Sequence, residues 1–340
     1  MSTGRPTHLL VGNPTAQSGK NAARIDRALA FLRAQGVSCE LVATLPAGRT
    51  IPAVREALDA GAHRVVIAMG GDGTFREVAA GLCESARRED VALGMLPTGT
   101  ANDQGKSFGL EAGEAELERN LSVVLAGNET RLDAGVIEHL DASGAVTLAT
   151  RFFDSAGWGI SARVLAQRNE DREIVSSIPI LKHVYRDHLV YAGAFFRTFL
   201  ESYVTTDEFD AVVETEDGTT ELTGLTDLVV KATRVYGGAW VFDRTSRHDD
   251  GLFEIVPFRG KLDWTSKGIV DLDGNPLTEE RLNTVGVSHS RPFRAARMRF
   301  HFTTRAGGAD LAAQIDGEEL RACADVSIRV LPRALRLIVP

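Results

Sequence analysis

The sequence predicts a two-domain α/β protein, in which an N-terminal three-layer α/β domain precedes a C-terminal antiparallel β-sandwich domain. Between residues 7 and about 130, apolar strands alternate with helical segments, a pattern typical of a sheet covered by helices on both faces. After Asn128 strand-like segments dominate, and turns such as Asp217-Gly218 separate them. A length of 340 residues also favours two domains over one.

The N-terminal half divides into four strands and four helices. Three of the strands are continuous apolar runs, as expected for buried parallel strands, whereas the second alternates between apolar and polar residues. We expect strands at residues 8–12, 37–43, 64–69 and 91–95, and helices near residues 19–35, 50–60, 74–84 and 112–126.

The C-terminal half has the strand pattern of a sandwich, interrupted by two helical stretches at residues 159–172 and 180–203. We therefore place the first domain at residues 1–130 and the second, acceptor-binding domain with its two inserted helices at residues 131–325. Its strands are expected at residues 131–138, 146–153, 209–216, 227–233, 252–257 and 298–304, with a last strand at 326–338.

Composition excludes several classes of protein. The net charge of −8 argues against nucleic acid as a main partner and against bulk electrostatic adsorption to anionic lipid. Three scattered cysteines without metal-ligand spacing fit a reducing cytoplasm. We expect no signal peptide, because the short polar N-terminus leads directly into a strand, and no apolar run reaches the roughly 18 residues of a membrane span.

The most informative segment follows the apolar strand Val66–Met69 and reads Gly70-Gly71-Asp72-Gly73-Thr74. Glycines let a backbone approach an anion closely and turn its N–H groups toward it. The residues after Thr74 have helical character, so the turn also lies at a helix N-terminus, where anions are favoured. We interpret the turn as a nucleotide phosphate site; a plain strand-to-helix turn is the alternative.

Two further segments support this interpretation. Asn13-Pro14 follows the first strand, and the segment Thr98–Asp103 follows the strand at residues 91–95. All three segments end strands that should be parallel neighbours, and ligands of open α/β sheets bind at that edge. The residues predicted to bind the nucleotide are Asn13, Pro14, Gly19, Thr44, Gly70, Gly71, Asp72, Gly73, Thr74, Thr98, Gly99 and Thr100.

In this order, the segments resemble the diacylglycerol kinase-like lipid kinases, a superfamily that also holds sphingosine kinases and, more distantly, NAD kinases. Segments 152–160, 249–253 and 314–318 resemble later motifs of that family, so the resemblance covers nearly the whole chain. It implies an ATP- and Mg²⁺-dependent kinase that phosphorylates a hydroxyl of a lipid such as diacylglycerol. It also implies that residues 326–340 return to complete the first domain.

The catalytic residues predicted on this basis are Asp72, Asp103, Asp316 and Glu318. Asp72 is expected to hold Mg²⁺, directly or through water, because Mg²⁺ favours carboxylates and waters; a turn-stabilising role is the alternative. The resemblance places Asp103 near the acceptor hydroxyl and the metal; the alternative is that Asp103 only caps the N-terminus of a helix. The resemblance also implies that Asp316 is the general base, supported or replaced by Glu318. The alternative is that Asp316-Gly317 is only a hairpin turn.

The resemblance also implies further metal ligands at Asp133, Asp250 and the carbonyl of Leu252. The chain departs from the family at Arg247, which stands where a side-chain ligand is expected and cannot bind a cation. Either Asp249 compensates, or the guanidinium itself neutralises Asp250. A second departure is Gln104-Gly105-Lys106, where the family usually has an aromatic-small-Arg run.

Two alternatives to a lipid kinase stay open. An NAD kinase would share the glycine motif, but the Asn-Glu pair of NAD kinases is replaced here by the segment 99–103. A nucleotide- or lipid-binding regulator without turnover is the other, and the intact acidic residues argue against it. We expect the protein to be cytoplasmic, a possible homodimer, and in transient contact with a lipid at a membrane surface. The apolar stretch 189–200 either packs in the core or lines a lipid cleft or membrane-facing surface.

Overall fold

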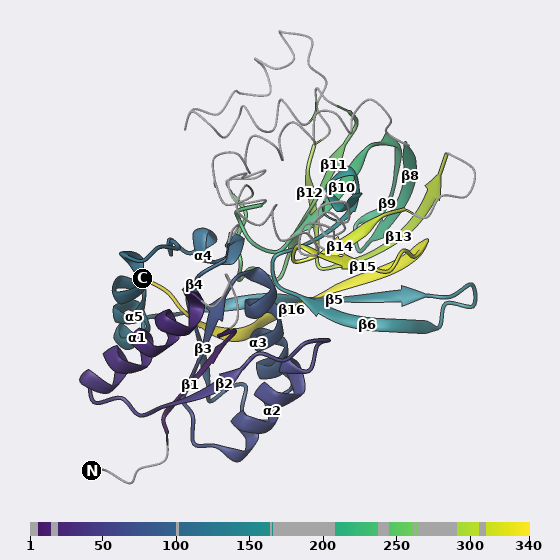
Figure 1. The fold of residues 1–340 in the computed structure, drawn as a ribbon. Coiled ribbons are helices and arrows are strands. Elements are labelled where there is room, and N and C mark those ends of the chain that lie inside the picture. Colours follow the sequence, from purple (N-terminus) through teal and green to yellow (C-terminus); the bar gives the residue numbers. More distant parts are fainter. Residues whose placement is uncertain are drawn as a thin grey trace, which may run out of the picture.

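This computed structural model describes residues 6–14, 20–99, 102–163, 165, 208–236, 245–260, 263, 291–305 and 311–340. Within them, the predicted fold class is confirmed: an α/β domain with a largely parallel sheet is joined to an antiparallel sandwich (Figure 1). The first expected helix insert begins as a short helical segment at residues 160–163, and the rest of both inserts, with the apolar stretch 189–200, lies outside the described residues.

The first domain is built on four parallel strands in the order β2-β1-β3-β4. Its strands are β1 (His8–Gly12), β2 (Cys39–Ala43), β3 (Val65–Gly70) and β4 (Ala92–Pro97). The order reverses direction between β1 and β3, and in open α/β sheets such a switch point opens the crevice where ligands bind. The alternating strand β2 lies at the edge of the sheet, which explains its polar residues.

Helices cover both faces of this sheet (Figure 1). Helices α1 (Lys20–Ala34) and α5 (Glu116–Ala126) cover one face, and α2 (Thr50–Ala60) and α3 (Asp72–Glu84) cover the other. Helix α3 buries Phe75, Val78 and Leu82, whose spacing places them on one side of the helix. Full burial of each such side chain stabilises the fold by about 1.5–3 kcal/mol. A fifth, short helix, α4 (Asp103–Ser107), follows β4.

The second domain packs two sheets face to face. One contains β16 (Asp325–Ile338), β13 (Arg297–Thr304), β8 (Phe209–Thr215) and β9 (Gly218–Leu225). The other contains, in order, β12 (Phe293–Ala295), β11 (Phe253–Phe258), β10 (Asp227–Lys231), β7 (Ser155–Gly159), β14 (Ala313–Ile315) and β15 (Glu318–Leu320). Between them, the ring of Trp158 lies 5.4 Å from that of Phe300 and 4.9 Å from that of Phe302.

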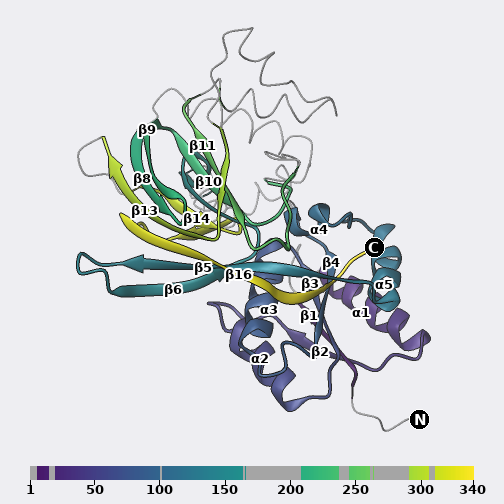
Figure 2. The ribbon, with the colours of Figure 1, turned by 180° about the vertical axis from the view of Figure 1, so that it is seen from behind.

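Two long strands connect the domains, as the view from behind shows (Figure 2). Strand β5 (Glu129–Leu140) pairs antiparallel with β16 and carries β6 (Val146–Phe152) on its other side. The end of β16 pairs in parallel with β4, with Arg336 opposite Ala92. The sheet of the first domain therefore continues into the second. Both expected boundaries, at residues 130 and 325, fall inside these strands, and the division into two domains remains a proposal.

Among the described residues, no helix has the length and apolarity needed to cross a membrane.

Candidate active site

The glycine turn after β3 packs directly on the turn after β4. The N–H of Thr98 donates to the carbonyl of Gly70 at 2.8 Å. A Cβ on Gly71 would lie 3.2 Å from the Cα of Gly99, and a Cβ on Gly99 would lie 2.5 Å from the Cα of Gly71. The contact between the two backbones therefore restricts position 99 to glycine, whereas a side chain at position 71 would require a small shift of Gly99.

The other two glycines of the turn have different surroundings. A Cβ on Gly70 would overlap the side chain of Thr74, which lies in the first turn of α3. Around a Cβ on Gly73, the described atoms within 4 Å belong to the carboxylate of Glu318, with Oε1 at 2.7 Å. Gly73 is thus the point where the second domain approaches the phosphate turn.

Asp72 connects the glycine turn to helix α4. It begins α3, and its Oδ1 accepts the N–H of Gln104 at 3.2 Å. Burial raises the pKa of Asp72 to about 6, and the neighbouring carboxylate of Asp154 adds to this rise. Asp72 is half-buried, and a carboxylate beside a second carboxylate attracts a cation, although the N-terminus of α3 itself favours anions.

Asp103 is the first residue of α4 and is 8% exposed. It precedes the residue that bonds to Asp72, so the two aspartates lie at the same edge of the sheet. Asn102, with φ of 52°, accepts the N–H of Gly99 and donates to its carbonyl, both at 2.8 Å. Asparagine tolerates this left-handed conformation, and its side chain fixes the turn. Asn102 therefore has a structural role.

Asp316 lies in the turn between β14 and β15 and is 4% exposed. Its carboxylate accepts three backbone N–H groups, those of Phe153 (2.9 Å to Oδ2), Asp154 (2.8 Å) and Ser155 (3.0 Å). Burial raises the pKa of Asp316 to about 7, with the carboxylate of Asp154 as the next cause, against the lowering effect of these bonds. A carboxylate that titrates near neutral pH is suited to accept a proton, and this one also holds the start of β7 in place.

A buried ion pair lies next to Asp316. Nζ of Lys231 donates to Oδ1 of Asp154 at 2.9 Å, and the hydroxyl of Thr233 donates to the same oxygen. Lys231 also donates to the carbonyl of Val235 at 2.6 Å, and the N–H of Val235 donates to Ser107 of α4 at 2.9 Å. A polar network therefore runs from α4 to the residues that hold Asp316.

Sequence reasoning missed this network. The signal was a lysine inside the apolar strand 227–231, because a charge buried there requires a partner. Asp154 appeared only as part of a family-like segment, and nothing in the local pattern pointed to Lys231 as its partner.

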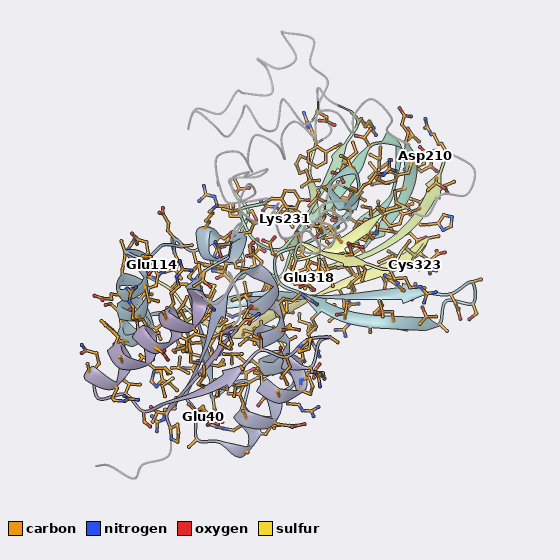
Figure 3. The ribbon with its side chains drawn as sticks, viewed as in Figure 1. Glu40, Glu114, Asp210, Lys231, Glu318 and Cys323 are labelled. Carbon is orange, nitrogen blue, oxygen red and sulfur yellow. The ribbon has the colours of Figure 1, made fainter. Side chains whose placement is uncertain are left out.

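Glu318 lies where the two domains meet (Figure 3), and its carboxylate pairs with the guanidinium of Arg76 on α3. The Glu318 side chain is 51% exposed, in contrast to the buried Asp316. The Asp316-Gly317 turn thus carries one buried carboxylate, that of Asp316, and is followed by an accessible one, that of Glu318.

The remaining predicted nucleotide residues lie at the carboxyl ends of adjacent strands. Asn13 and Pro14 follow β1, and the carbonyl of Asn13 accepts Nδ2 of Asn21 at 2.7 Å. Thr44 follows β2, and its N–H donates to the carbonyl of Gly12 at 3.0 Å. Gly19 and Thr100 lie outside the described residues. The described members thus share the edge of the sheet that holds the glycine turn.

The residues expected to form a second metal site are held mainly by backbone contacts. Both oxygens of Asp133 accept N–H groups, from Gly251 at 2.7 Å and from Arg333 at 2.5 Å. Asp250 accepts the N–H of Leu252 at 3.1 Å. In the described part of the chain, no group of three or more His, Cys, Asp or Glu residues is arranged to hold a metal.

The guanidinium of Arg247 pairs with Asp249, at 3.1 Å. Among the described residues, the carboxylate that Arg247 neutralises is thus that of Asp249, whereas the expectation named Asp250. A metal at Asp250 and Leu252 stays a prediction. Asp72 fits Mg²⁺ better, because that ion commonly takes one or two carboxylates and completes its shell with water and substrate phosphates.

Residues 7–137 match the family described as the diacylglycerol kinase catalytic domain. Over these residues the chain is similar to the diacylglycerol kinase catalytic domain, as the motifs of its first half predict.

Relatives of this chain include two bacterial proteins described as probable lipid kinases. One, described as YegS-like, from Klebsiella pneumoniae (strain 342), is 34% identical over 148 residues, which cover 44% of this chain and 46% of the relative. The other, described as YegS, from Escherichia fergusonii, is 32% identical over 167 residues, which cover 48% and 50%. The chain spans about half the length of these curated relatives.

Two solved structures resemble the fold over nearly the whole chain. A diacylglycerol kinase from Bacillus anthracis str. Sterne superposes with a TM-score of 0.67 at 18% identity, covering 100% of this chain and 99% of that one. Yeast NADH kinase complexed with NADH superposes with a TM-score of 0.51 at 8% identity, covering 99% and 84%. At these identities the likeness concerns the fold alone.

Proposed function

We propose that the protein is an ATP-dependent lipid kinase that transfers the γ-phosphate of ATP to a hydroxyl of a lipid such as diacylglycerol. One observation carries the proposal. The glycine turn, the half-buried Asp72 and the Asp316–Glu318 turn lie close together. Glu318 reaches Gly73, and the carboxylate of Asp154 acts on both Asp72 and Asp316. A phosphate site and a candidate base are therefore neighbours.

The first domain would hold the nucleotide. N–H groups of the glycine turn and the N-terminus of α3 favour negative charge, which suits the triphosphate. Mg²⁺ would be bound by Asp72 and by phosphate oxygens, and it would neutralise charge that develops on the γ-phosphoryl group. Asp72 and Asp103, which lie at the same edge, would then face the reacting end of ATP.

The second domain would supply the base. As the bond between the γ-phosphorus and the oxygen of ADP breaks, a new bond forms to the lipid hydroxyl oxygen, whose proton passes to a carboxylate. Asp316 is our choice for this carboxylate, because its pKa of about 7 allows it to be ionised and still accept a proton. Glu318 is the alternative, since it is the more exposed of the two.

The lipid acceptor is supported by the relatives, which are described as probable lipid kinases. Diacylglycerol, a sphingoid base, phosphatidylglycerol and a polyketide-like alcohol all present a hydroxyl that this chemistry could use. Peripheral contact with a membrane surface, a cytoplasmic location and a homodimer belong to the same proposal. NAD is the second candidate acceptor. Its support is weaker than that of a lipid, because the likeness to NADH kinase concerns the fold alone.

The experiment is a transfer assay with γ-labelled ATP and Mg²⁺, in which purified protein is given each lipid in detergent micelles and, separately, NAD. We expect label in a lipid product and none in NADP, with Asp72→Asn as an inactive control. Label in NADP would instead show that the protein is an NAD kinase. Binding of ATP without transfer to any acceptor would favour a regulator and refute the kinase proposal.

A further inference from the structure

The carboxylate of Glu318 lies beside the first turn of α3, close to the phosphate turn. Its Oε1 is 2.7 Å from where a Cβ at Gly73 would stand, and its Oε2 pairs with Nη2 of Arg76. Helix N-termini attract anions, and here the chain itself places an anion there. A triphosphate bound to the same turn would be repelled by this carboxylate unless the charges rearrange.

Arg76 is the cation at this point. It lies four residues after Asp72 on α3, and its side chain is 14% exposed. Its Nε is buried and has no hydrogen-bond partner among the described residues. A guanidinium has five N–H donors and binds phosphate through two of them at once, so Arg76 can serve another acceptor beyond Glu318.

We propose that Arg76 binds a phosphate of the nucleotide, and that Glu318 pairs with Arg76 until the triphosphate displaces it. In the free protein, Glu318 neutralises the partly buried guanidinium. When ATP binds, the guanidinium passes from the carboxylate to the phosphate, and Glu318 is released from the pair. The inference rests on the proposed function, because it takes ATP as the ligand of the glycine turn.

A different role for the pair would be a plain latch between the domains. The chain offers a matched control for that role, because Arg151 on β6 pairs with Glu84 near the other end of α3 at 3.1 Å. The two ion pairs both join α3 to another element, but the Arg151 pair is at the opposite end of the helix from the glycine turn. A general effect of loosening α3 should therefore appear in Arg151→Gln as well.

The test is calorimetric titration of the full chain with ATP and Mg²⁺ in the absence of lipid. We expect Arg76→Gln to weaken ATP binding about tenfold or more, because a charged hydrogen bond to phosphate is lost and Glu318 is left unneutralised. Glu318→Gln should tighten it about two- to fivefold, because the competing ion pair is gone. Arg151→Gln should leave it unchanged, and adenosine should bind all variants alike.

The double variant Arg76→Gln/Glu318→Gln separates the two parts of the proposal. If Arg76 contacts phosphate, the double variant binds ATP more weakly than wild type. If its affinity returns to the wild-type value, Arg76 merely neutralises Glu318 and the phosphate contact is refuted. If Arg76→Gln, Glu318→Gln and Arg151→Gln weaken ATP binding equally, the Arg76–Glu318 pair only holds the domains together, and the proposal is refuted. A wild-type protein that binds no ATP would overturn the proposed function and this inference together.

Discussion

The Lys231–Asp154 ion pair should be essential for the stability of the second domain and for the position of Asp316. Lys231 is 2% and Asp154 3% exposed, so neither charge can be compensated by water when its partner is removed. Replacing Lys231 by Met keeps the length of the side chain but leaves the carboxylate of Asp154 with hydroxyl donors alone, from Thr233 and Ser155.

The expected cost follows from this geometry. Removing one partner of a buried ion pair usually costs about 3–5 kcal/mol, because the remaining charge is buried without compensation. We expect a loss within this range for Lys231→Met, measured as the free energy of unfolding in urea. Because total stabilities are about 5–15 kcal/mol, such a loss would strongly lower the urea concentration at which half of the protein is unfolded.

The double variant Lys231→Met/Asp154→Asn is the control. It removes both charges, and the carbonyl oxygen of the new amide side chain can still accept the hydroxyl of Thr233. We expect it to recover a substantial part of the loss, so that the two substitutions are not additive. A loss below about 1 kcal/mol for Lys231→Met, or full additivity in the double variant, would refute the reasoning that the pair is buried and mutually dependent.

The remaining predictions concern the site and its pH dependence. Asp72→Asn should abolish turnover and raise the Mg²⁺ concentration required, as initial rates against Mg²⁺ will show; normal rates at low Mg²⁺ would contradict its role. Asp316→Asn should lower kcat about 10²–10⁴-fold, and wild-type kcat should fall below about pH 7, because the raised pKa leaves the base protonated there. Since this carboxylate also holds three N–H groups, Asp316→Asn must be shown to be folded by circular dichroism. Gly71→Ala should weaken ATP binding and also shift the contact with Gly99, so a variant with unchanged ATP affinity would remove this turn from the site. Burial raises the pKa of Asp227 to about 7 from 3.8, so the folded state keeps this proton to a higher pH than the unfolded state does. The free energy of unfolding should therefore fall as the pH rises between these two values. Urea titrations at several pH values should show a smaller fall for Asp227→Asn.

Local pattern predicted most of the first domain. The apolar runs and the helix at residues 50–60 match the observed elements, because burial on one face repeats with the period of the element. Where the ends differ, tertiary contacts decide: α5 begins at Glu116 instead of residue 112, and α3 begins at Asp72, already within the glycine turn. In the second domain, the short strands β12, β14 and β15 have too few residues to give a period.

Short motifs in the sequence are enough to identify the groups at the site, because the chemistry of the glycine turn, Asp72 and the Asp316–Glu318 pair is local. Which of these groups face one another follows from the fold alone. Asp316 binds the N–H of Asp154, 162 residues away, and Glu318 pairs with Arg76, 242 residues away. Hydrophobic periodicity predicts whether a residue is buried, but the partner of a buried charge depends on which distant strands lie next to each other. Here the pairing of β5 with β16 brings the two domains together and so decides these partners.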